Sequence, residues 1–180
     1  MLSETEKTAI FTGLPKTPLT IGATSYTPYV EYADRGPTVT ELLRDHPLVA
    51  TLRYYNDLPD PEASAGNQLI DRKVVGSDLQ YTHGKKRQVT ASLNIYACDS
   101  NNLPAADLVD TYANAVLLWV QNTLPKTISI ARDPSMSDLS YLETAGTERR
   151  QVEWLIRYEV SSIETIKTVD TMDPPDIDFS

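Results

Sequence analysis

The sequence predicts an α+β fold: a mostly antiparallel sheet with one long helix packed on one face, plus extended N- and C-terminal arms. Two alternating runs, KKRQVTASLNIYA (Lys85–Ala97) and RRQVEWLIRYEV (Arg149–Val160), indicate two strands of one sheet. A strong helical pattern lies between them, and the two ends of the chain are rich in proline or in acidic residues. We therefore expect an extended arm at 1–37, a single α+β domain at 38–168 and an acidic tail at 169–180.

The first 37 residues contain prolines at four positions, namely Pro15, Pro18, Pro28 and Pro37. Proline fixes φ and removes a backbone donor, so long regular elements are not expected here. A short strand at Tyr29–Tyr32 fits the pattern. The arm would either drape over a neighbouring subunit or form a loop wrapped on its own core.

The first helix expected in the chain follows this arm. Thr38 and Glu41 have the spacing of a capping box, in which both side chains satisfy amides at the start of a helix. His46 precedes a proline and should end that helix. We expect a strand at 48–55 and then a surface loop at 56–67.

Residues 68–75 and 77–82 are predicted to be extended, with a turn supplied by Gly84. The next run alternates strictly over residues 87–97, which predicts a strand with one apolar face and one wet or intersubunit face. The apolar face would consist of Val89, Ala91, Leu93, Ile95 and Ala97.

The long helix is expected after Pro104, which suits a first helical turn, and it should stop at Pro125. Its apolar stripe has helical spacing and consists of Leu108, Tyr112, Ala115, Val116, Trp119 and Thr123.

A short strand at 127–131 and a loop with one helical turn should follow the long helix. The last strand places Trp154 on an apolar face and should extend to Ile163 or Ile166. We expect both tryptophans of the chain, Trp119 and Trp154, in the core.

The bulk composition narrows the class of protein. The net charge of −9 argues against nonspecific nucleic-acid binding as the main role, since such binding needs clustered cations. The single cysteine, Cys98, makes an intrachain disulfide impossible, and no signal peptide or membrane span is recognised in the sequence. We expect a soluble protein that stays inside a cell or is assembled into a particle there.

No motif in the sequence indicates catalysis, and we expect a protein that is not an enzyme and that has no cofactor. The chain lacks a nucleophile elbow, a phosphate-binding loop and the His and Cys spacing of a metal site; only His46, His83 and Cys98 offer such groups. The best alternative is a cation-dependent hydrolase that uses loop carboxylates, for which the candidates are Asp57, Asp60 and Glu62.

Two clusters of cations precede the two long strands: Lys85, Lys86 and Arg87, and then Arg149 and Arg150. They could solvate the ends of strands, contact an acidic partner subunit or contact nucleic acid. If the protein assembles, these residues are the expected contacts to an acidic neighbour. The tail aspartates would supply the other half of the pairing, and they are Asp170, Asp173, Asp176 and Asp178.

The stretch RQVTASLNIYACDSNNLPAADLVDTYANAVLLWVQ, then a short strand, then ERRQVEWLIRYEV, resembles the tail-terminator (tail-completion) proteins of tailed viruses. The resemblance covers about residues 68–166 and depends on element order and pattern. The long N-terminal arm and the acidic tail depart from typical members. Asp outnumbers Glu and Arg outnumbers Lys, so a salt-loving source such as a haloarchaeal tailed virus would fit; an ordinary acidic protein is the alternative.

This resemblance implies a structural virion protein, made in the host cytoplasm, that forms a hexameric ring at the neck between head and tail. Its partners would be copies of itself, the tail-tube protein and a head-completion or adaptor protein. Genome DNA would pass through an acidic lumen without specific binding. Another neck or tube component is the nearest alternative, and a cellular binding module is a further one.

Overall fold

The computed structural model describes residues 2–61, 68–76, 78–99, 104–124, 129–144 and 146–166. The chain divides into two compact units. Unit 1 comprises Met1–Asp60 and Arg87–Tyr158, and unit 2 comprises Pro61–Lys86 and Glu159–Ser180. Two long strands, β6 (Asp78–Cys98) and β8 (Thr147–Ile166), contribute residues to both units. This division differs from the single domain expected over 38–168.

The sheet of unit 1 has the order β3-β4-β6-β8-β7. Its other strands are β3 (Tyr29–Tyr32), β4 (Leu48–Pro59) and β7 (Ser129–Asp138). β3 pairs with β4 in parallel, whereas β4 with β6 and β7 with β8 are antiparallel. The prediction of a mostly antiparallel sheet in an α+β fold is therefore confirmed.

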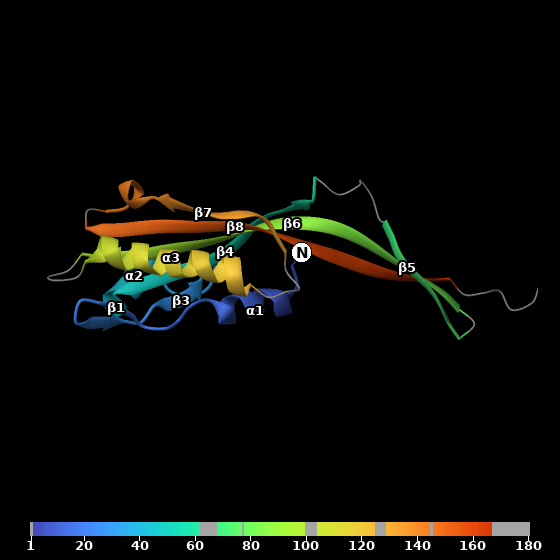
Figure 1. The fold of residues 1–180 in the computed structure, drawn as a ribbon, viewed down its shortest axis with the longest axis horizontal. Coiled ribbons are helices and arrows are strands. Elements are labelled where there is room, and N and C mark those ends of the chain that lie inside the picture. Colours follow the sequence, from blue (N-terminus) through green and yellow to red (C-terminus); the bar gives the residue numbers. More distant parts are fainter. Residues whose placement is uncertain are drawn as a thin grey trace, which may run out of the picture. The chain divides into compact units, whose positions relative to one another are not determined.

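The core of unit 1 lies between this sheet and α3 (Ala105–Thr123), which covers one face of the sheet (Figure 1). Alternation along β6 and β8 places apolar side chains on that face. Trp154 is 1% exposed and Trp119 is 9% exposed, so both tryptophans belong to the core as predicted. All five residues of the predicted apolar face of β6 are buried. No described helix is both long enough and apolar enough to span a membrane.

The N-terminal segment is not an extended arm, and this prediction is wrong. It contains α1 (Glu4–Gly13), the hairpin of β1 (Leu19–Ile21) and β2 (Thr24–Tyr26), and then β3. Leu2, Ile10, Leu14 and Tyr26 from this segment are buried in the core of unit 1. The alternative of a segment wrapped on its own core is the one observed, because these four apolar side chains are removed from water there.

The described chain has other helices beside the long helix on the sheet; α2 (Val39–Asp45) was expected from the sequence, whereas α1 was not. α1 begins with a capping box between Ser3 and Glu6 that the sequence analysis overlooked. α2 begins with the predicted box between Thr38 and Glu41 and ends before Pro47. A short 3-10 turn, η1 (Ser140–Leu142), follows β7.

A stack of aromatic and cationic side chains attaches α1 to β3. The rings of Phe11 and Tyr32 are stacked with their centroids 4.5 Å apart. Lys16 Nζ lies 4.7 Å from the Phe11 centroid, and the Arg35 guanidinium lies 5.1 Å from the Tyr32 centroid. The two cations thus bracket the ring pair, an arrangement that the quadrupoles of the rings favour.

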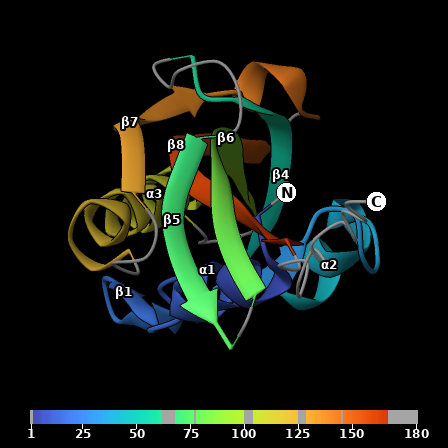
Figure 2. The same ribbon diagram turned by 90° about the vertical axis from the view of Figure 1, so that its right-hand side faces the viewer.

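Unit 2 is built on β5 (Gln68–Val75), which pairs with β6 in an antiparallel hairpin (Figure 2). The turn lies at Gly76, whose φ of 65° suits glycine. The predicted turn at Gly84 is wrong, because Gly84 pairs with Gln68 inside the continuous strand β6. β8 also reaches this unit, where Glu164 lies 3.4 Å from His83.

The described residues of unit 2 contribute nothing to the hydrophobic core. They instead expose large apolar side chains: Leu69 (54%), Val74 (71%), Val75 (46%), Val160 (39%), Ile163 (64%) and Ile166 (48%). Paired residues on adjacent strands share a face of the sheet. By this rule Leu69 and Val74 of β5 lie on one face with Leu79, Tyr81 and His83 of β6.

Candidate functional site

Arg87, one of the predicted interface cations, is engaged inside unit 1. Its Nε donates to Asp57 Oδ1 at 2.7 Å and its Nη2 to the Asp57 carbonyl at 2.9 Å. The hydroxyl of Tyr158 donates to the same carboxylate at 2.5 Å. Burial raises the pKa of Asp57, but these hydrogen bonds outweigh it and hold the pKa below its ordinary value. Burial and the bond to Asp57 together raise the pKa of Tyr158 to about 12.

Arg149 and Arg150 are adjacent in β8 and therefore point to opposite faces of the sheet. Arg150 faces α3, where Nε lies 2.6 Å from Asp110 and Nη1 lies 2.8 Å from Asp138. Its side chain is only 11% exposed. Arg150 thus ties α3 to the strands β7 and β8 within unit 1.

Arg149 points to the face away from α3. Its Nη1 lies 2.7 Å from Glu143, and its Nη2 donates to Asn94 at 2.8 Å. The guanidinium also lies 5.2 Å from the centroid of the Tyr96 ring. This arginine joins a strand of the sheet to the turn after β7.

The polar face of unit 1 continues from Arg149 along β8. Gln151 donates to Ser92 at 2.8 Å and to Glu153 at 2.7 Å, and Tyr55 bonds to the same glutamate. Burial and this bond raise the pKa of Tyr55 to about 12. A row of mutually bonded polar side chains, instead of an apolar surface, therefore lines this face, which suits contact with water or with a polar partner.

The remaining predicted interface residues are two lysines and the four tail aspartates. Lys85 and Lys86 are exposed on β6 in unit 2. Asp170, Asp173, Asp176 and Asp178 lie outside the residues that the structure describes. Of the five predicted cations, only the two lysines therefore remain as exposed candidates for contact with another molecule.

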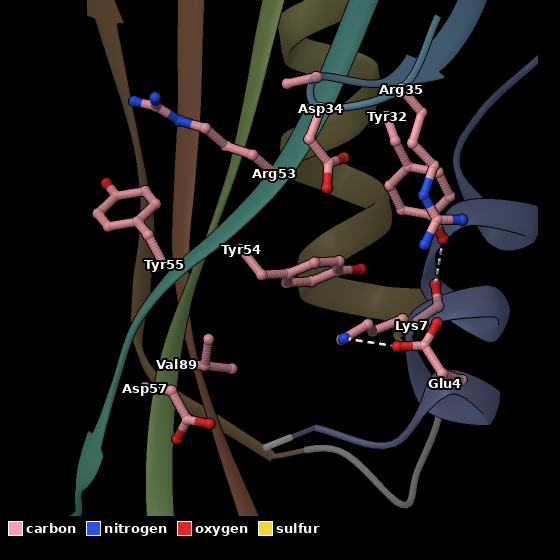
Figure 3. Close-up of a pocket in the computed structure, with 11 residues that line it drawn as sticks. Glu4, Lys7, Tyr32, Asp34, Arg35, Arg53, Tyr54, Tyr55, Asp57 and Val89 are labelled. Carbon is pink, nitrogen blue, oxygen red and sulfur yellow. Dashed lines mark hydrogen bonds and ion pairs between the residues drawn. The ribbon is translucent and has the colours of Figure 1, made fainter.

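A cavity of about 550 Å³ lies beside β4, a site that the sequence analysis did not find (Figure 3). In Figure 3, Arg53 and Tyr55 lie on one side of β4. Tyr54 lies on the other side, where it faces Lys7 and Tyr32. We call it the β4-edge cavity. Its lining comes from α1, β3 and the loop after it, β4 and β6, and includes Glu4, Asp34, Arg35 and Asp57. The only signal in the sequence was the tyrosine pair at 54 and 55.

Most charges around this cavity are balanced. Lys7 lies 2.7 Å from Glu4, and Asp57 is paired with Arg87. Within the described part of the chain, Arg35 and Arg53 form no ion pair. Each lies over a tyrosine ring instead, with Arg53 5.2 Å from the Tyr55 centroid. Apart from the paired charges, the lining carries the guanidiniums of Arg35 and Arg53 and the carboxylate of Asp34. The cavity is therefore weakly cationic.

The carboxylates considered for cation chemistry serve other contacts. Asp57 binds Arg87, and Asp60, which is 5% exposed, lies 3.0 Å from Arg157. Glu62 lies outside the described residues. Across the described ranges, no group of three His, Cys, Asp or Glu side chains is placed to hold a metal ion.

His46 and His83 both make aromatic contacts. The His46 ring stacks on Tyr29 at 4.2 Å between centroids, at the C-terminal end of α2. The His83 ring lies 6.3 Å from the Tyr81 ring. Cys98 is a free thiol at the end of β6.

Comparison with known proteins does not assign the chain to a family. No protein-family model matches the sequence, and no curated protein is significantly similar to it.

Proposed function

We propose that this protein is a structural component of a tailed virion, namely a tail terminator that forms a hexameric ring at the neck. In this role it caps the tail tube and joins it to the head connector. The ring partners are copies of the same chain, the tail-tube protein binds one side, and a head-completion or adaptor protein binds the other.

The apolar surface of unit 2 carries this proposal. A hairpin that buries no core of its own is only marginally stable in water. The described part of unit 2 nevertheless exposes Leu69, Val74 and Ile163 by more than half. Leu69 and Val74 lie on one face of the hairpin, and exposed apolar patches mark surfaces that bind another protein. We infer that unit 2 is an assembly element that a neighbouring subunit covers.

The contrast between the two units supports a ring. Unit 1 presents the hydrogen-bonded polar side chains of Gln151 and Glu153, and unit 2 presents apolar side chains. A contact between two different surfaces of identical subunits is heterologous, and such contacts close into rings when the rotation permits. The net charge of −9 fits a lumen that repels the phosphates of a passing genome.

The mass of the purified protein in solution, combined with electron microscopy, tests the proposal. A closed ring of six copies, and stacking of that ring on the end of tail tubes, is the expected result. A strict monomer, both alone and with the tail-tube protein present, would contradict it. Rings that stack on one another into long tubes would favour the alternative of a tube component.

A further inference from the structure

The outer edge of β4 is open just beyond the end of β3. β3 pairs with β4 only as far as Tyr32 opposite Leu52, and on its other side β4 pairs with β6. From Arg53 to Tyr55, before the β-bulge between Tyr55 and Leu58, no described strand lies along the outer edge. Open edges display unpaired N–H and C=O groups, and an extended peptide can bind them as an additional strand.

The open edge coincides with the β4-edge cavity. In Figure 3 the edge of β4 faces the viewer, with Arg53 and Tyr55 on one side and Tyr54 and Tyr32 on the other. Because side chains of a strand alternate between faces, an added strand would present one set to Arg53 and the other set to the tyrosine rings. The first side therefore favours acidic side chains. The second side offers the rings of Tyr54 and Tyr32 to an apolar side chain, beside the ion pair of Lys7 and Glu4.

The chain itself contains a segment with this alternation. Residues 176–179 read Asp-Ile-Asp-Phe, so the two aspartates share one face of an extended segment and Ile177 shares the other with Phe179. These residues follow Pro174 and Pro175 and lie outside the described part of the structure. Arg87, Arg149 and Arg150 already have carboxylate partners in unit 1, which leaves them less suited to receive these aspartates.

We propose that the acidic C-terminal segment of one copy binds the β4 edge of another copy as an added strand. Asp176 and Asp178 pair with Arg53, while Ile177 and Phe179 enter the tyrosine-lined side of the cavity. The proposal names the contact between neighbours and so rests on the proposed assembly, but the binding step can be measured without a ring.

The test uses a fluorescein-labelled peptide of residues 173–180 and the full-length chain carrying Ile177→Ser and Phe179→Ser, which weaken its own tail as a competitor. Fluorescence anisotropy should show saturable binding. Arg53→Glu in that chain should weaken binding by at least about tenfold, because it exchanges an attraction for a repulsion between charges. Arg44→Glu, at an exposed position of α2, is the matched control and should leave binding unchanged.

The mode of binding has its own control. In a strand, alternate N–H groups point to the same edge. N-methylation at residues 177 and 179 therefore blocks the N–H groups of one edge, and N-methylation at 176 and 178 blocks those of the other. One of the two should bind like the parent and the other should not bind. Equal binding of both would rule out strand addition.

Two further results would overturn the inference. One is the absence of saturable binding, or equal binding to the Arg53→Glu chain. The other is equal affinity for a scrambled peptide of the same composition, which would make the edge a general acceptor of extended segments. Rings that form normally while the peptide fails to bind would refute this contact alone, whereas peptide binding by a chain that never forms rings would refute the proposed function alone.

Discussion

The buried hydroxyl groups of two tyrosines in unit 1, Tyr112 and Tyr54, differ in their hydrogen bonding. Tyr112 donates to the Pro15 carbonyl at 2.9 Å, which holds the segment after α1 against α3. The buried Tyr54 hydroxyl has no hydrogen-bond partner among the described residues. Burial raises the pKa of both phenols above their ordinary range.

Replacing each tyrosine with phenylalanine should therefore have opposite results. Tyr112→Phe should lower the free energy of unfolding by about 1–2 kcal/mol, because it leaves the Pro15 carbonyl without its donor. Tyr54→Phe should leave that free energy unchanged or raise it by up to about 1 kcal/mol, because it removes an unsatisfied polar group. Urea unfolding measures both; a larger loss for Tyr54→Phe than for Tyr112→Phe would contradict this account.

Asp57 should make stability depend on pH in the acid range. Because its pKa is lower in the folded than in the unfolded protein, the unfolded state binds the proton first on acidification. Its contribution is present above the ordinary carboxyl pKa of about 4 and is lost as the pH falls through the folded pKa.

Asp57→Asn should therefore flatten the loss of unfolding free energy that the parent chain shows below pH about 4. Tyr158→Phe removes one of the hydrogen-bond donors to the Asp57 carboxylate and should give an intermediate slope. Denaturant titrations at a series of pH values from neutral to acid provide the measurement. An Asn variant that keeps the full parental slope would show that Asp57 is not the group responsible.

At the scale of elements, the close approach of α1 to α3 depends on the absence of a side chain at Gly13. A Cβ at Gly13 would lie 2.9 Å from Cζ2 of Trp119, closer than real Cβ contacts. The absence of a side chain at this position lets the end of α1 approach the tryptophan ring. Helix propensity alone would favour alanine here, so packing between helices outweighs it.

Gly13→Ala should lower the free energy of unfolding by about 1–3 kcal/mol, because the added methyl group displaces Trp119 or the helix. Thr12→Ala, at the exposed neighbouring position, is the matched control and should be neutral or slightly stabilising. Thermal unfolding followed by Trp fluorescence measures both. Equal melting temperatures for the two variants would show that α1 can shift without cost.

At the scale of the whole molecule, unit 2 should matter for assembly and not for the fold of one chain. Leu69 is 54% exposed and Val74 is 71% exposed. Replacing both with lysine should change the free energy of unfolding by less than about 0.5 kcal/mol. The same pair should abolish the ring, because it places charge in an apolar contact.

Light scattering of the Leu69→Lys, Val74→Lys double variant gives the oligomeric mass. Leu118→Lys is the matched control, since Leu118 is 60% exposed on α3 in unit 1. The control should assemble like the parent chain. Assembly of the double variant at the parental mass would remove the apolar face of unit 2 from the contact.

The sequence by itself determined the elements whose signal is local. The alternation at residues 87–97, the capping box of Thr38 and Glu41, and the stop before Pro47 depend only on neighbours along the chain, and each appears as expected. The core positions of the two tryptophans were likewise predicted from local patterns, helical spacing for Trp119 and strand alternation for Trp154. The capping box of Ser3 and Glu6 was equally local and could have been found.

Only the tertiary structure decided how distant segments meet. The folding of residues 2–37 onto the core, the engagement of Arg87, Arg149 and Arg150 with carboxylates, and the open edge of β4 all depend on pairs of residues far apart in sequence. Gly84 illustrates the reason: glycine permits a turn, but Gly84 pairs with Gln68 and β6 continues through it as a strand. Local preference sets what a segment can do, and long-range pairing and burial select which option is realised.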